Sequence, residues 1–215
     1  MRITKEHDVR RNEILDTAEM LFETKGYSNT TVNDILREVN IAKGTFYYYF
    51  KSKEEVLDAV IERHLEKGLE RAEAVKKRKD LSPAEKLTQV VLVLRMAGPK
   101  SEVVDELHKP ENALMHQKSL GGIIRGLVPI LNEIVEEGIR AGVFSTPFPE
   151  QTVRIMLAAA LTLTDDAMFS YTQEERQQLL EAIVYSLETL LGAERGSLGL
   201  KTHLLQGERG EEEKA

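Results

Sequence analysis

The 215-residue chain contains no cysteine, and it begins with a polar stretch that lacks the apolar core of a signal peptide. Without cysteine there are no disulfides and no thiolate metal sites, so a reducing compartment is the default. No apolar run approaches the roughly 20 residues that a membrane helix needs. We therefore expect a cytoplasmic protein without a membrane partner.

Sequence motifs of enzymes are also missing. There is no nucleophile elbow, phosphate loop, dinucleotide fingerprint or HExxH helix. Asp165 and Asp166 form a carboxylate pair, but adjacent residues on a helix point about 100° apart, which prevents joint acid–base work. We therefore expect neither an enzyme nor a cofactor.

The charge balance does not suit a general nucleic-acid binder, because the formal net charge is −7. The distribution is more informative than the total. Residues 39–53 contain three lysines and no acidic residue, and Arg10 and Arg11 form a second small basic spot. Any DNA contact would therefore depend on a local basic face.

The spacing of apolar and turn residues predicts an all-α fold, because no stretch alternates with the period of a strand. One segment, 111–141, contains Gly121, Gly122, Gly126 and Pro129, and a kink or break is expected there. The predicted helices are a first one ending at Lys25, then 31–39, 43–50, 52–79, 83–97, 102–108, 111–141, 149–169 and 173–191.

Residues 31–53 have the spacing of a helix-turn-helix, whose second helix lies in the major groove of DNA. In that second helix Phe46 and Phe50 are four residues apart and can be buried on one face. Gly44 weakens a helix, which is sensible where the backbone approaches DNA closely. The residues left to point outward are Lys43, Thr45, Tyr47, Tyr48 and, as a further candidate, Tyr49.

The run from Gly26 to Val32, Ile35, and the run from Lys43 to Glu54 resemble the DNA-binding domain of the tetracycline-repressor (TetR) family. The resemblance covers about residues 8–60. It implies a homodimer with an all-helical larger domain that holds a ligand pocket, and ligand binding that releases DNA. Two positions depart from the usual pattern, Asn40 in the turn and Ala42 at the cap of the third helix.

The same resemblance assigns roles to individual residues. It implies that Lys43, Gly44 and Tyr47 face base edges. The positions implied to contact phosphates are Thr31, Thr45, Tyr48 and Lys53, with Tyr49 as a further candidate.

The expected domains are a helix-turn-helix domain at 1–51, a helical ligand-binding and dimerisation domain at 52–193, and a flexible tail at 194–215. The family layout implies that the last two long helices form a bundle between two subunits. The alternative is that their apolar residues pack within one subunit. The candidate interface residues are Val153, Leu157, Leu161, Leu180, Ile183, Val184 and Leu187.

Polar and sulfur-containing residues of the larger domain are candidates for lining a ligand site. His108, Asn112 and His116 recur every four residues, so they share a face where the backbone is helical. Met96 and Met115 would add adaptable apolar lining. The alternatives are surface or capping roles for the histidines and ordinary core roles for the methionines. No metal is expected.

These features predict a dimeric regulator that binds a double-stranded DNA operator and is released from it by an unidentified small molecule. Two alternatives stay open. One is a helical dimeric interaction protein that has lost DNA binding, and the other is a regulator without a small-molecule inducer.

Overall fold

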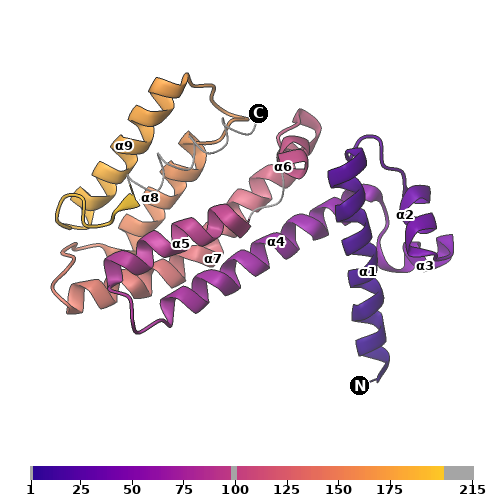
Figure 1. Cartoon of the computed structure of the whole chain (residues 1–215), viewed down its shortest axis with the longest axis horizontal. Helices are drawn as coiled ribbons and strands as arrows, with labels where there is room; N and C mark the ends of the chain where they lie inside the picture. Colours follow the sequence, from indigo (N-terminus) through magenta and orange to yellow (C-terminus); the bar gives the residue numbers. More distant parts are fainter. Residues whose placement is uncertain (1, 98–100, 201–215) are drawn as a thin grey trace. The chain divides into compact units, whose positions relative to one another are not determined.

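A computed structural model describes the backbone of residues 2–97 and 101–200, and the side chains of residues 7–94 and 103–200. Within these ranges the fold is all-α, as predicted (Figure 1). The elements are α1 (Arg2–Lys25), α2 (Val32–Val39), α3 (Lys43–Tyr49), α4 (Lys53–Lys76), α5 (Pro83–Ala97), α6 (Ser101–Leu107), the 3₁₀ helix η1 (Pro110–Asn112), α7 (Ala113–Arg140), α8 (Pro149–Leu163) and α9 (Gln173–Leu190).

The chain divides into two compact units. The N-terminal unit consists of residues 1–66 and 98–119, and the C-terminal unit of residues 67–97 and 120–215. The expected boundary near residue 51 therefore does not follow the packing. Val103 and Leu107 of α6 are buried in the same core as α1 to α4, and this burial places α6 and η1 with the helix-turn-helix.

The N-terminal unit is built around side chains that the helical periodicity brings to one side of each helix. Burial of each valine, leucine, isoleucine or phenylalanine side chain among them contributes about 1.5–3 kcal/mol to folding. The members of this core with no exposed surface are Ile14, Leu15, Ala18, Phe22, Ile35, Phe46, Val56, Leu57 and Val60.

The turns that set α2 and α3 at an angle have local causes. Gly26 has φ +83°, a left-handed conformation that ends α1 and that glycine adopts without strain. Thr31 caps α2 through a reciprocal capping box with Asp34. Asn40 takes φ +57° at the C-cap of α2, so asparagine serves where glycine would otherwise be favoured.

The core of the C-terminal unit lies between α5, α7, α8 and α9 and the second half of α4. Helix α7 runs without interruption from Ala113 to Arg140 with Pro129 inside it, so the predicted break is absent. One of the glycines named in that prediction, Gly126, has a packing role. A Cβ at Gly126 would lie 2.5 Å from Leu69, so glycine allows the close approach of α7 to that side chain.

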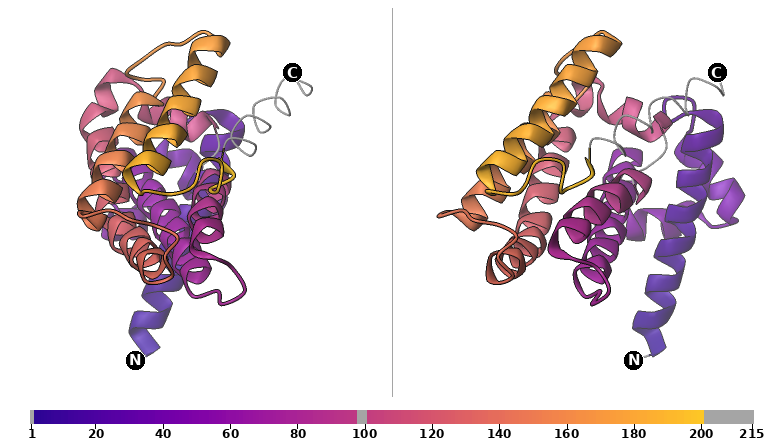
Figure 2. Two further views of the ribbon diagram at one scale, coloured as in Figure 1. Left: turned by 90° about the vertical axis from the view of Figure 1, so that its left-hand side faces the viewer. Right: turned by 60° about the vertical axis from the view of Figure 1, so that its left-hand side comes forward.

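The helices α8 and α9 lie side by side in every view (Figure 2). Helix α8 ends at Leu163, earlier than the predicted end at residue 169, and Thr164 forms its C-cap. Thr172 and Glu175 form the capping box that starts α9, as the sequence predicts.

Residues 194–200 correct the expectation of a flexible tail from residue 194. Leu198 and Leu200 are buried in the core of the C-terminal unit. The buried carboxylate of Glu188 accepts hydrogen bonds from the backbone N–H groups of Gly196 and Leu198. The remainder of the predicted tail, 201–215, lies outside the described residues. Among the described helices, none is long and apolar enough to span a membrane.

Candidate nucleic-acid interface and ligand segment

The third helix presents an exposed polar and aromatic face because its apolar face is fixed in the core. Phe46 is fully buried and Phe50 is 2% exposed. On the other side Tyr48 is 72% exposed and Tyr47 is 47% exposed. Lys43 is exposed as well, and its ammonium lies 5.9 Å from the centre of the Tyr47 ring. The predicted outward direction of these three side chains is therefore the observed one.

Two further positions on α3 are less open than predicted. Thr45 and Tyr49 are half-buried, and Tyr49 packs against the apolar core of the N-terminal unit. Gly44 is exposed, and a Cβ there would meet nothing within 4 Å. Packing inside this chain therefore does not require glycine at position 44, which leaves close approach by an outside molecule as a reason for it.

Thr31 already uses both of its hydrogen-bond donors within the chain. Its backbone N–H donates to Oδ2 of Asp34 at 2.9 Å, and its hydroxyl donates to the same oxygen at 2.7 Å. Lys25 donates to that oxygen at 2.6 Å. The hydrogen bond from Lys25 and those from Thr31 hold the pKa of Asp34 well below its usual range. A phosphate contact from Thr31 would have to replace one of these bonds.

Lys53 also points toward the protein. Its ammonium donates to the backbone carbonyls of Tyr27 and Thr30, at 2.8 and 2.9 Å, and lies 4.0 Å from the centre of the Tyr27 ring. Burial lowers the pKa of this lysine. An ammonium has three donors, so one remains for a phosphate. The lysine thus ties the start of α4 to the turn before α2.

Two tyrosines of α3, Tyr48 and Tyr49, have a partner in α1 that the sequence did not predict. The ring of His7, in α1, lies 4.7 Å from the Tyr49 ring and 5.6 Å from the Tyr48 ring, measured between centroids. Arg11 lies over the ring of Phe50 at 5.4 Å. The N-terminal half of α1 therefore contacts the end of α3. In the sequence, the only indication of a role for this part of α1 was the basic pair Arg10 and Arg11.

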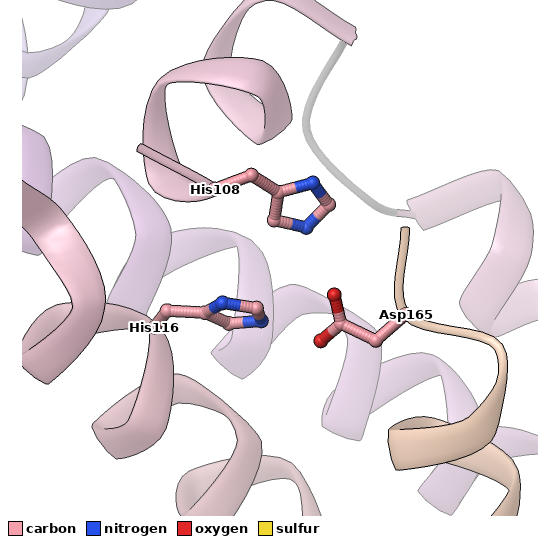
Figure 3. Close-up of side chains that lie close together, drawn as sticks. All are labelled: His108, His116 and Asp165. Atoms are coloured by element: carbon pink, nitrogen blue, oxygen red, sulfur yellow. The ribbon is translucent and has the colours of Figure 1, made fainter. Parts of the chain in front are cut away.

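The candidate ligand residues between positions 108 and 116 belong to the N-terminal unit. His108 follows α6, η1 connects α6 to α7, and His116 falls in the first turn of α7. The two rings lie 4.9 Å apart between centroids (Figure 3). Met115 packs against the apolar core, and the side chain of Met96 lies outside the described residues.

Asn112 holds this segment together. Its buried amide donates to the backbone carbonyl of Glu106 at 2.8 Å and to the carboxylate of Glu106 at 3.3 Å. The same carboxylate accepts a bond from Lys109 at 2.6 Å, and both residues contact Ser28, in the turn that precedes α2. These bonds connect the candidate ligand segment to the helix-turn-helix.

A hollow of about 350 Å³ opens on the surface of the C-terminal unit. None of the predicted ligand residues lines it. Its lining residues are Arg125, Val128, Pro129, Asn132, Glu133, Glu150 and Arg154.

The candidate interface residues of α8 and α9 are divided between two environments. Val153 and Val184 are buried in the core of their own subunit, and Leu157 and Leu187 pack against that core. Packing within one subunit thus accounts for these four. The three others are half-buried, namely Leu161, Leu180 and Ile183. The most exposed large apolar residues of the two helices are Ile155, Tyr185 and Leu190.

Residues 31–53 thus form a helix-turn-helix with an exposed α3, which defines a DNA-binding protein. Residues 14–60 match the family model for bacterial regulatory proteins of the tetR family, and residues 96–184 match a tetracyclin repressor-like C-terminal domain. The chain belongs to the tetR family of transcriptional regulators.

Individual relatives agree with the family. The chain is 26% identical over 182 residues to the fatty acid metabolism regulator protein of Bacillus subtilis (strain 168), which covers 83% of this chain and 92% of that protein. It is 42% identical over 52 residues to the biofilm operon negative transcriptional regulator IcaR of Staphylococcus epidermidis, 24% of this chain and 28% of IcaR.

The crystal structure of RolR with resorcinol has the same fold, with a TM-score of 0.61 and 19% identity over 92% of this chain and 95% of that one. At that level of identity the likeness concerns the fold alone.

Proposed function

We propose that this regulator is a dimeric repressor that binds a near-palindromic operator and leaves it when a small molecule binds. DNA binding is supported by the exposed face of α3. Lys43, Tyr47 and Tyr48 are exposed on that helix, while Phe46 and Phe50 are buried in the core. This arrangement suits insertion of α3 into the major groove, because the helix is fixed by its core side and open on the other.

The roles on this face divide into base contacts and phosphate contacts. Lys43 and Tyr47 would donate to base edges near the start of α3, and the uncovered Gly44 would let the backbone approach the DNA. Tyr48, Thr45 and the remaining donor of Lys53 would bind phosphates. Thr31 would do so only by exchanging its bond to Asp34, so we expect its contribution to be the smallest.

Two exposed apolar residues support the dimer. Ile155 on α8 is 62% exposed and Leu190 on α9 is 47% exposed. Apolar surface of this kind favours association, and a dimer places two recognition helices in successive major grooves, about one turn of DNA apart. IcaR, which is named a negative regulator, supports repression for this chain as well.

The test is a fluorescence-anisotropy titration of the full chain against the DNA upstream of its own gene, with scrambled DNA as control, at two salt concentrations. Lys43→Ala and Tyr47→Phe should each weaken binding to the preferred operator by about 1–3 kcal/mol. Each should also change the order of affinities among operator variants. Tyr171→Phe, on the segment before α9, is the matched control and should bind as the unaltered chain does.

Two outcomes count against the proposal. Equal, salt-sensitive binding to both DNAs would mean that specific recognition is absent. If Lys43→Ala weakens every sequence equally, Lys43 contacts a phosphate and the assigned base contact is wrong.

A further inference from the structure

The two histidines of the candidate ligand segment form a pair that the proposed function does not use. His108 and His116 are eight residues apart, and η1 brings their rings to a centroid separation of 4.9 Å with 33° between the ring planes (Figure 3). His116 is only 8% exposed, and one nitrogen of each ring lies within 4.8 Å of a nitrogen of the other.

The backbone that carries the pair is held on both sides. Before His108, Leu107 is buried in the core of the N-terminal unit, and Glu106 is bonded to Asn112 and Lys109. Before His116, Met115 packs against the same core. A site with fixed ligands loses little conformational entropy on binding, so these contacts prepare the two rings for a shared ligand.

The chemistry of two neighbouring imidazoles selects a class of ligand. Neutral imidazole nitrogens suit zinc, nickel, copper and cobalt, and they suit magnesium and calcium poorly. Bonds of about 2.0–2.1 Å to a tetrahedral ion place two nitrogens roughly 3.3 Å apart, so a small rotation of the two rings would bring both nitrogens to one ion.

We propose that His108 and His116 together bind one divalent transition-metal ion of the zinc class. Two ring nitrogens fill two coordination positions, and the others are left to water or to oxygen atoms of further ligands. Such an ion would hold the end of α6 and the start of α7 at a fixed separation.

A chain of hydrogen bonds connects the segment that contains the two histidines to the turn before α2. Glu106, two residues before His108, is bonded to Lys109 and, with it, to Ser28. Ser28 lies beside Tyr27 and Thr30, whose carbonyls accept the bonds of Lys53. We infer that the metal changes operator affinity through this turn. This second inference rests on the proposed function, whereas the metal site does not.

The first experiment is calorimetric titration of ZnCl₂ into the untagged, metal-free full chain, with MgCl₂ as the control ion. We expect one zinc ion per chain, no magnesium binding, and a melting temperature that rises with zinc concentration. His108→Gln and His116→Gln should each weaken zinc binding by more than about tenfold, a loss that even outer-shell partners can cause. His7→Gln removes another histidine and should bind zinc normally.

Circular dichroism establishes whether each variant is folded before it is titrated. His108 is half-buried, so His108→Gln provides the answer if His116→Gln fails to fold. Saturable binding that is lost with either ring supports the site. Zinc binding that survives both substitutions, or no saturable binding in the unaltered chain, overturns it.

The second experiment repeats the operator titration with and without zinc. A change in operator affinity that disappears in His108→Gln supports the regulatory inference. Equal operator affinity in both conditions, with zinc shown to be bound, overturns that inference and leaves the metal site standing. Failure of operator binding itself would reject the proposed function, and the calorimetry would still decide the metal site.

Discussion

Single side chains decide how the helix-turn-helix is held, and Asp34 is the clearest example. Its carboxylate accepts from the backbone and hydroxyl of Thr31, and it pairs with Lys25 and Arg37. One carboxylate thus joins the end of α1 to the start of α2. The capping box was visible in the sequence as Thr31 followed by Asp34, but Lys25, nine residues earlier, was not, because only the turn at Gly26 brings it close.

Replacement of Asp34 should therefore give a pH-dependent loss of stability. The folded pKa lies below the ordinary value of 3.8, first because of the bond from Lys25 and then because of Thr31. The folded state consequently binds fewer protons than the unfolded state in acid. The contribution of the carboxylate is complete above the unfolded pKa and is lost as the pH falls toward the folded pKa.

We expect Asp34→Asn to melt below the unaltered chain at neutral pH, and the difference to shrink progressively below about pH 4. Thermal melts followed by circular dichroism measure it. Lys25→Met should reproduce part of the loss, since it removes the first of the partners. A difference that stays constant into acid would show that the charge of Asp34 is not its cause.

At the scale of elements, the periodicity of the sequence is a good predictor of where helices form. It is a poorer predictor of which residues those helices contact. The face of α3 formed by Phe46 and Phe50 follows from a spacing of four residues, and the observed burial agrees. The glycines and Pro129 of α7 predicted a kink or break, and the break is absent because α7 is one continuous helix. The packing partner of Gly126 is Leu69 on α4, and no local sequence pattern indicates that contact.

The glycines of α7 provide a matched test of this packing role. A Cβ at Gly126 would lie 2.5 Å from a methyl carbon of Leu69, so Gly126→Ala should lower the free energy of unfolding by about 1–3 kcal/mol. A Cβ at Gly121 would meet only the flexible end of Arg125, at 3.0 Å. Gly121→Ala should therefore be neutral or stabilising by up to about 1 kcal/mol, the helix propensity gain.

Urea unfolding of both glycine variants measures the contrast. Similar stabilities for the two variants would mean that α7 and α4 adjust easily around the extra carbon. In that case the kink suggested by the sequence, and not close packing, would be the reason for glycine in α7.

For the whole molecule, the sequence supplied the fold class and the position of the DNA-binding helices, because these depend on patterns within about twenty residues. It did not supply the division into units. The burial of Leu107 with α1 and of Leu198 with α5 and α7 depends on contacts between distant segments. The ring contact between His7 and Tyr49 is of the same kind.

The proposed dimer is a property of the whole molecule. Val153 and Val184 are already used inside the subunit, so an interface on α8 and α9 would have to be built from the apolar side chains that remain exposed. Ile155, at 62% exposed, is the largest such contribution from α8. A charge at that position would be buried without a partner in a dimer but would stay in water in a single subunit.

We therefore expect Ile155→Asp to convert a dimer into a folded monomer, detected by sedimentation, and to lower operator affinity because two linked recognition helices become separate binders. Phe148→Asp is the control, since Phe148 is 64% exposed just before α8 and the same change there should leave the dimer intact. If Ile155→Asp stays dimeric, α8 does not form the interface. If it becomes monomeric and still binds the operator with unchanged affinity, the dimer is not what creates operator affinity, and the proposed arrangement of two heads on one operator is wrong.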